Sequence, residues 1–178
     1  MKYLIMCEGP NELEVINILL ENDCLIFTRD DLLGLVAYHA RQIKKSGQVK
    51  TALNMCPEQV EILRIGDKFS DKLDIPKEYK EKISSVKKYC TKPELEMLLI
   101  ISEGKTKEFE KVKSRMKAKI FAKGNIKCGK KSYKNDTAFY RDYYGNDVSL
   151  LVNSIKEYQR HKKRSHNPDE QCLAELLK

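Results

Sequence analysis

Two acidic residues stand where expected strands of the sequence end. Glu8 follows the apolar run Tyr-Leu-Ile-Met-Cys at residues 3–7, and Asp67 follows the stretch Glu-Ile-Leu-Arg-Ile-Gly at residues 61–66. Short apolar runs bounded by Gly or Pro are typical of strands that are covered on both faces of a parallel sheet. Ligands of such sheets bind beyond the carboxyl ends of the strands. We therefore expect Glu8 and Asp67 to converge at one edge of a sheet.

Two further carboxylates are candidates for the same site. Asp71 lies in the loop just after Asp67, and Glu96 ends the stretch Lys-Pro-Glu-Leu-Glu at residues 92–96. Clusters of carboxylate oxygens suit Mg²⁺ or Mn²⁺, which take one or two carboxylates together with water and substrate phosphate oxygens. The predicted metal ligands are Glu8, Asp67, Asp71 and Glu96, and the first three are the predicted catalytic residues. Other roles remain open, because Glu8 could be a helix-start carboxylate and Asp67 a turn residue.

Charge divides the chain into an acidic and a basic part. Residues 1–74 hold 9 Lys/Arg against 12 Asp/Glu, and the other 104 residues hold 25 against 14. Within the second part, residues 105–134 hold 12 Lys/Arg and two Glu. Carboxylates for a cation beside ammonium groups for a polyanion indicate a phosphate-binding metal site, although a solvated lysine-rich face explains the charge equally well. The predicted nucleic-acid contacts are Lys68, Lys72, Lys92, Lys105, Lys113, Arg115, Lys130 and Lys131, with Tyr133 as a base-stacking partner.

Strands and helices alternate in the first part of the chain, which predicts an α/β fold with a parallel sheet flanked by helices. Strands are expected at residues 3–7, 24–28 and 61–66, and the only later candidate is 119–122. Helices are expected after Asn11, which we take as a cap, and after Asp30 or Asp31, where Leu32, Leu35, Val36, His39 and Ile43 would share a face. Thr91 and Glu94 resemble the capping box of a helix that starts at Thr91-Lys92-Pro93-Glu94 and continues through the apolar residues up to Ile101. More helices are expected at about 51–59, 106–117, 135–144 and 146–162, with a Gly- and Lys-rich loop at 123–134.

Length and composition predict one domain over residues 1–178, with a strand-helix-strand-helix core at 1–75 and a mainly helical, lysine-rich extension at 76–178. No apolar run approaches the roughly 20 residues that a membrane helix needs, so we expect no membrane association. No secretory signal is visible, and the six cysteines form no Cys-x-x-Cys pair. Both observations favour a cytoplasmic protein with reduced thiols.

The stretch Cys-Glu-Gly-Pro-Asn-Glu at residues 7–12, after an apolar strand, resembles the first motif of the TOPRIM fold. Topoisomerases, DnaG-type primases, OLD-type nucleases and small phage-defence nucleases share this fold. The resemblance covers roughly residues 2–72 and implies that Glu8 is the acid of the first motif. It also implies that Asp67 is the first acid of the second motif, and that together they hold Mg²⁺ and act on a phosphodiester.

The second motif departs from the family pattern, in which two aspartates stand one residue apart. This chain has Gly-Asp-Lys-Phe-Ser-Asp at residues 66–71. Either Asp71 substitutes from the loop, or the metal is held weakly, or catalysis has been lost. The expected function is therefore a TOPRIM-like, metal-dependent nuclease or related phosphoryl-transfer protein acting on DNA or RNA. The alternatives are a catalytically degenerate nucleic-acid-binding or regulatory subunit, for example of a phage-defence complex, and a protein-interaction subunit with a protein partner.

Overall fold

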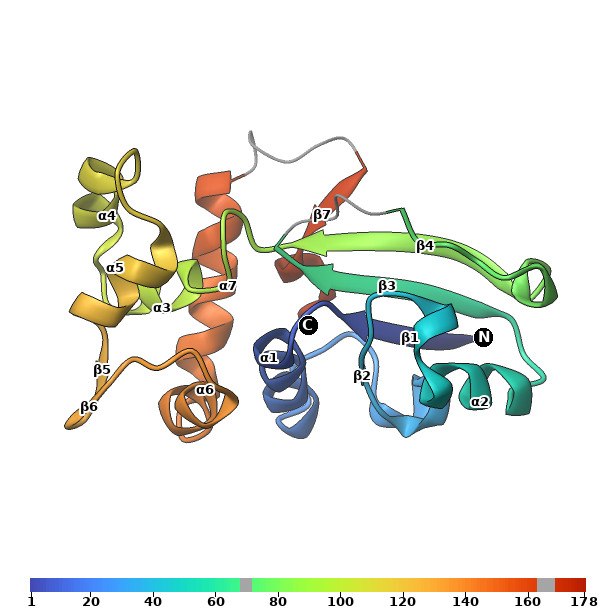
Figure 1. Ribbon diagram of the computed structural model, residues 1–178. Helices are drawn as coiled ribbons and strands as arrows, with labels where there is room; N and C mark the ends of the chain where they lie inside the picture. The colour runs from blue at the N-terminus through green and yellow to red at the C-terminus, as the bar shows by residue number, and fades with distance from the viewer. Residues whose placement is uncertain (68–71, 163–168) are drawn as a thin grey trace.

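A five-stranded parallel sheet with strand order β2-β1-β3-β4-β7 forms the centre of the protein (Figure 1). The computed structural model describes residues 1–67, 72–162 and 169–178. The strands of the sheet span Lys2–Cys7 (β1), Tyr38–His39 (β2), Val60–Gly66 (β3), Ile83–Cys90 (β4) and Glu170–Cys172 (β7). A small antiparallel hairpin pairs Lys127–Cys128 (β5) with Lys131–Ser132 (β6).

Helices surround the sheet and continue beyond one end of it. The α-helices span Pro10–Glu21 (α1), Gly47–Met55 (α2), Met97–Ser102 (α3), Thr106–Val112 (α4), Ala118–Asn125 (α5), Thr137–Tyr144 (α6) and Val148–Lys162 (α7). Short 3-10 turns lie at Arg29–Asp31 (η1), Leu33–Leu35 (η2), Ile43–Lys45 (η3), Lys77–Tyr79 (η4) and Leu173–Leu176 (η5). Within the described ranges, no helix is both long enough and apolar enough to cross a membrane.

Side chains of the central strands alternate between two hydrophobic clusters. Ile5 and Cys7 of β1 pack into the larger cluster with α1, α3, α6 and α7, whereas Leu4 and Met6 pack into the smaller one with α2. Successive residues of a strand point to opposite faces, so these two clusters cover the two faces of the sheet. This double cover explains why β1 is an uninterrupted apolar run.

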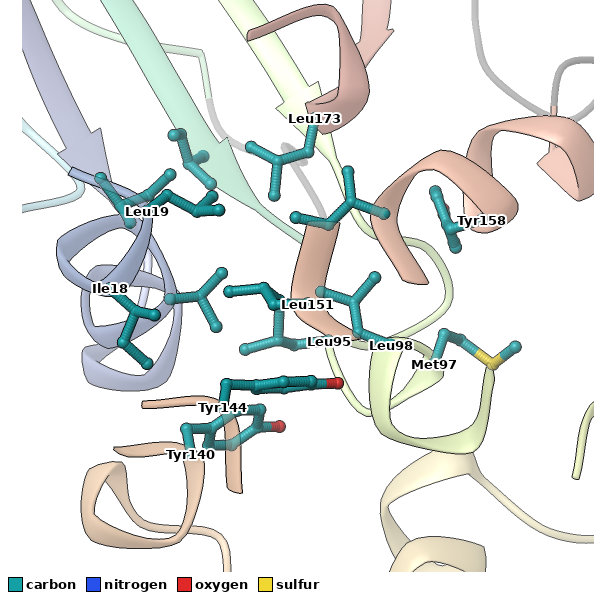
Figure 2. Packing of buried hydrophobic residues seen from close by; sticks show 14 of the residues in the cluster. Ile18, Leu19, Leu95, Met97, Leu98, Tyr140, Tyr144, Leu151, Tyr158 and Leu173 are labelled. Carbon is teal, nitrogen blue, oxygen red and sulfur yellow. The ribbon is translucent and has the colours of Figure 1, made fainter. Parts of the chain in front are cut away.

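The larger cluster joins the sheet to the helices that lie beyond the carboxyl ends of β3 and β4 (Figure 1). Figure 2 shows its members converging from five elements and one connecting segment. The elements are α1, α3, α6, α7 and η5, and the segment is the one before α3 that holds Leu95. Tyr140, Tyr144 and Tyr158 are almost fully buried there. The sheet and the helical region therefore share one core, and the strand ends face the junction between them.

The expected parallel sheet with flanking helices is confirmed, and so are β1, β3, α6 and α7. The strand expected at residues 24–28 is wrong, because this stretch contributes only an isolated bridge between Leu25 and Leu177. The helix expected after Asp30 is also wrong: the chain forms short turns there and then enters β2. Gly34 and Leu35 both have φ above +60°, in the left-handed region, which ends a right-handed helix.

Residues 119–122, the only later candidate for a fourth strand, are part of α5, and β4 lies at Ile83–Cys90 instead. β4 contains several polar residues, so a search for apolar runs does not detect it. Lys87 and Ser85 both bond the carboxylate of Glu61 on the neighbouring strand β3, and such cross-strand pairs stabilise a polar strand inside a sheet. β4 and β7 extend the sheet into residues 76–178, the part of the chain that was expected to be mainly helical.

Candidate functional site

The ends of β1 and β3 bring Glu8 and Asp67 to the same edge of the sheet. The two strands run parallel with Cys7 opposite Ile65, and the N–H of Glu8 donates a hydrogen bond of 2.8 Å to the carbonyl oxygen of Ile65. Glu8 therefore lies beside Gly66, and Asp67 follows directly. This register brings the two positions to one edge of the sheet, as we expected from the sequence.

Two glycines make room for carboxylates at this edge. A Cβ atom on Gly66 would lie 2.5 Å from Oε2 and 2.7 Å from Cβ of Glu8. A Cβ atom on Gly9 would lie 2.6 Å from Oε2 of Glu12. Neither position tolerates a side chain without displacing an acid, so each glycine lets a carboxylate lie against the backbone.

Gly9 and Glu12 line a pocket of about 240 Å³, which we call the acid pocket. Its wall comprises the turn from β1 into α1 (residues 9–12), Asp67, residues 94–96, Lys119 of α5 and Asn135. Five parts of the chain that are far apart in sequence thus meet at the carboxyl ends of β1 and β3.

Asp67 is the most strongly perturbed acid of the pocket. Its Oδ1 accepts a hydrogen bond of 3.0 Å from the hydroxyl of Thr91, which follows β4. Burial, and then the charge of Glu12, raise the pKa of Asp67 from 3.8 to about 8, with smaller contributions from Glu96 and Glu8. Asp67 is therefore protonated at neutral pH unless a cation enters the pocket.

Glu12 is an acid of the site that the sequence analysis missed. It lies in the first turn of α1 and is 9% exposed, and burial followed by the charges of Glu8 and Glu96 raises its pKa. Its spacing from Glu8 was a usable signal, because a residue in the first turn of the helix after β1 lies over the end of that strand. Asn11 was expected to cap α1, but the cap position is Gly9, and the amide of Asn11 donates to Oδ1 of Asn135 at 2.8 Å.

Glu96 faces the interior between the sheet and the helical region. It is 5% exposed, and its Oε1 accepts a hydrogen bond of 2.6 Å from the hydroxyl of Tyr133. Tyr133 is itself 3% exposed, so its expected role as a base-stacking partner at the surface is wrong. Its hydroxyl instead holds Glu96 in place at the edge of the acid pocket.

The capping box expected at Thr91 and Glu94 is wrong, because both side chains bond partners outside the helix that they were expected to cap. Thr91 is buried and bonds Asp67, and the helix begins only at Met97. Oε2 of Glu94 accepts a hydrogen bond of 2.8 Å from the backbone N–H of Lys119. Glu94 therefore caps a different helix, α5, and holds the amino end of that helix against the acid pocket.

Two cations that the sequence analysis did not select lie at the site. Arg41 follows β2 and donates from Nε to the carbonyl oxygen of Glu8 at 3.2 Å, while its Nη2 lies 3.4 Å from Oε1 of the same residue. Its side chain is 63% exposed. Lys119 is half-buried in the wall of the acid pocket. Both could contact a phosphate that approaches the carboxylates.

The predicted nucleic-acid contacts are not all free for binding. Lys92 forms an ion pair with Glu170, Lys113 with Glu110, and Lys131 with Asp142. Each of the three nevertheless keeps an accessible side chain, from 27% exposed for Lys92 to 75% for Lys131. Lys72, Arg115 and Lys130 are exposed and Lys105 is half-exposed, whereas Lys68 and the predicted acid Asp71 lie outside the described residues.

The carboxylates at this edge of the sheet have the donor chemistry that a hard divalent cation takes. Oε2 of Glu8 is buried and has no hydrogen-bond partner in the described structure, and a cation would neutralise the repulsion that raises the pKa of Asp67. Among the described residues, no three His, Cys, Asp or Glu side chains are placed to share one ion. Mg²⁺ needs only one or two carboxylates when water and substrate phosphates complete its shell, and two acids such as Glu8 and Asp67 would meet that requirement.

Comparisons with known proteins found no match for this chain. No family model matches the chain, and neither a curated protein nor a solved structure is significantly similar to it. Inference about function therefore starts from the acid pocket itself.

Proposed function

We propose that the protein is a TOPRIM-like, metal-dependent phosphoryl-transfer protein that hydrolyses phosphodiester bonds of nucleic acid in the acid pocket. The observation that carries this proposal is the meeting of Glu8 and Asp67 at the carboxyl ends of parallel strands, with the pKa of Asp67 raised to about 8. Strongly perturbed carboxylates that face a pocket are typical of functional sites. Mg²⁺ and Mn²⁺ are the cofactors that this donor chemistry favours.

Glu8 and Asp67 would hold the ion, and Asp67 would release its proton when the ion binds. When bound, a divalent ion activates water and stabilises negative charge on phosphoryl oxygens. Glu12 adds negative charge behind the two ligands, and the hydroxyl of Thr91 orients the Asp67 carboxylate. Glu96 adds a further negative charge at the same edge of the pocket.

Cations around the pocket would position the polyanionic substrate. Lys119 lies in the pocket wall and Arg41 lies beside Glu8, so both are suited to bind the oxygens of the reacting phosphate. The basic stretch at residues 105–134 would bind the flanking phosphates, with an affinity that falls steeply as salt is added.

The test is hydrolysis of labelled DNA and RNA in Mg²⁺ or Mn²⁺ by the wild type and by Glu8→Gln. We expect the wild type to cleave at least one of these substrates and Glu8→Gln to lose the activity. Glu81→Gln is the matched control, because Glu81 is exposed and lies outside the acid pocket. Equal cleavage by the wild type and Glu8→Gln would remove Glu8 from the mechanism.

A second function, binding of nucleic acid without catalysis, is favoured by one observation. Asp67 with a pKa of about 8 and a hydrogen bond from Thr91 is neutral and satisfied at pH 7 without a metal. Calorimetric titration with Mn²⁺ separates the two functions. Heat of binding that disappears in Asp67→Asn supports the enzyme, whereas a protein that is indifferent to Mn²⁺ yet binds nucleic acid supports the binding module.

A further inference from the structure

A second pocket of about 350 Å³ adjoins the acid pocket. It lies between the segment before α3 and the turn that joins α4 to α5, and Glu94 lines both pockets. Since α5 also contributes a neighbouring residue to each, Ala118 to this pocket and Lys119 to the acid pocket, the two cavities share one wall. A ligand in one pocket therefore lies next to the other pocket, with only this shared wall between them.

The second pocket has apolar walls. Pro93 and Met116 are accessible, with Met116 36% exposed, while Phe109 and Ala118 are buried behind them. A flat, apolar ring could lie between such walls and be shielded from water on both faces. The volume falls at the lower end of the range of small-molecule sites, which suits a single ring system and not a helix or a strand.

The rim of this pocket carries charges of both signs. Lys113 and Lys117 line it together with Glu94 and Glu110, and Lys119 continues the lysines into the acid pocket. Lys117 is exposed, and Lys113 keeps 57% of its side chain exposed although it pairs with Glu110. These lysines thus connect the apolar pocket to the proposed catalytic site with positive charge, as a phosphodiester chain would require.

We infer that the second pocket binds an unpaired nucleobase of a single-stranded nucleic acid whose adjacent phosphate lies in the acid pocket. This inference rests on the proposed function and adds a substrate class to it. A base can enter such a pocket only when it is not stacked in a duplex, so single strands are the preferred substrate. Contact between a base and the apolar walls does not depend on base identity, so we expect the site to accept more than one base.

The experiment compares two chains of equal length and charge, an oligothymidylate and its fully abasic analogue, in a fluorescence anisotropy titration. We expect the wild type to bind the abasic chain about tenfold more weakly, equivalent to about 1.4 kcal/mol, at the lower end of measured base-stacking contributions. Met116→Ala should lose most of this preference, and Met116→Leu should keep it. Ile120→Ala is the matched control, because Ile120 is an apolar residue of α5, 56% exposed, that does not line the pocket.

The inference is overturned if the abasic chain binds the wild type within about twofold of the oligothymidylate, or if Met116→Ala and Ile120→Ala change the ratio equally. Repeating the titration with an oligouridylate distinguishes DNA from RNA as the source of the base. A duplex competitor should displace neither the oligothymidylate nor the oligouridylate efficiently. Anisotropy reports binding alone, so a base preference without any hydrolysis would support this pocket while removing the proposed enzyme. Hydrolysis without a base preference would support the proposed enzyme and remove the second pocket as a base-binding site.

Discussion

Replacing Asp67 by asparagine tests the electrostatics of the acid pocket without requiring any activity. The pKa of Asp67 is 3.8 in an ordinary environment and about 8 in the folded protein, so the folded chain holds a proton that the unfolded chain has already released. The stabilisation from this proton is complete below pH 4 and is lost as the pH rises to about 8. Asparagine keeps an oxygen that can accept from Thr91 but cannot ionise.

Linkage gives the size of the effect. One extra proton in the folded state makes the free energy of unfolding fall by about 1.4 kcal/mol per pH unit, so the wild type should lose about 2 to 3 kcal/mol between pH 6 and pH 8. The full span from about 4 to about 8 sets an upper bound of about 6 kcal/mol. Asp67→Asn should show a much flatter dependence, to which Glu12 still contributes because its pKa is also raised.

Urea denaturation of the metal-free protein at several pH values between 6 and 8 measures both curves. Asp30→Asn is the matched control, because Asp30 is exposed and lies outside the acid pocket. Mn²⁺ added at the higher pH should restore stability to the wild type but not to Asp67→Asn, since the ion takes the place of the proton. Parallel curves for the wild type and Asp67→Asn would refute the assignment of a raised pKa to Asp67.

Two further substitutions probe how the acids are held. Gly66→Ala should lower the free energy of unfolding by about 1–3 kcal/mol, measured by urea denaturation, because the added Cβ would lie 2.5 Å from Oε2 of Glu8. Tyr133→Phe should cost about 1–3 kcal/mol in the same assay, because it leaves the buried carboxylate of Glu96 without its hydroxyl donor.

Each of these substitutions has a matched control in the chain. Gly47→Ala should be neutral or stabilising, because a Cβ at that position of α2 meets no atom within 4 Å. Tyr143→Phe removes a hydroxyl that donates to Glu103 in an exposed setting, where water can replace the lost bond. If Gly66→Ala or Tyr133→Phe cost no more than its control, the corresponding contact would not hold the site in place.

The sheet edge that carries Glu8 and Asp67 could be predicted because it depends on local sequence. β1 is an apolar run that ends at an acid, and β3 is a mainly apolar stretch, interrupted by Glu61 and Arg64, that ends at Gly66. Their parallel direction follows from the crossover connection between them. β4 escaped prediction because its polar residues are satisfied by partners in another strand, such as Glu61 for Lys87. Such cross-strand compensation is not visible in a window of a few residues.

The partners that complete the acid pocket come from segments that local signals assigned elsewhere. Glu94 has the spacing of a cap for its own helix, yet it accepts from the N–H of Lys119, 25 residues further along the chain. Thr91 likewise resembles a cap and bonds Asp67 instead. Short polar side chains can bond any backbone or side-chain donor that the fold presents, so their spacing alone predicts no specific partner.

The glycines of the strand ends hold information that a search for carboxylates overlooks. Gly9 and Gly66 each occupy the place where a Cβ would collide with an acid, Glu12 and Glu8 respectively. A glycine beside an acid at the carboxyl end of a buried strand therefore marks a carboxylate that lies against the backbone. Applied to this chain, that rule selects Glu12 together with Glu8, and the pKa of Asp67 depends more on Glu12 than on Glu8. Glu12→Gln should consequently lower the pKa of Asp67 more than Glu8→Gln does, which the midpoints of the pH-dependent unfolding curves would measure.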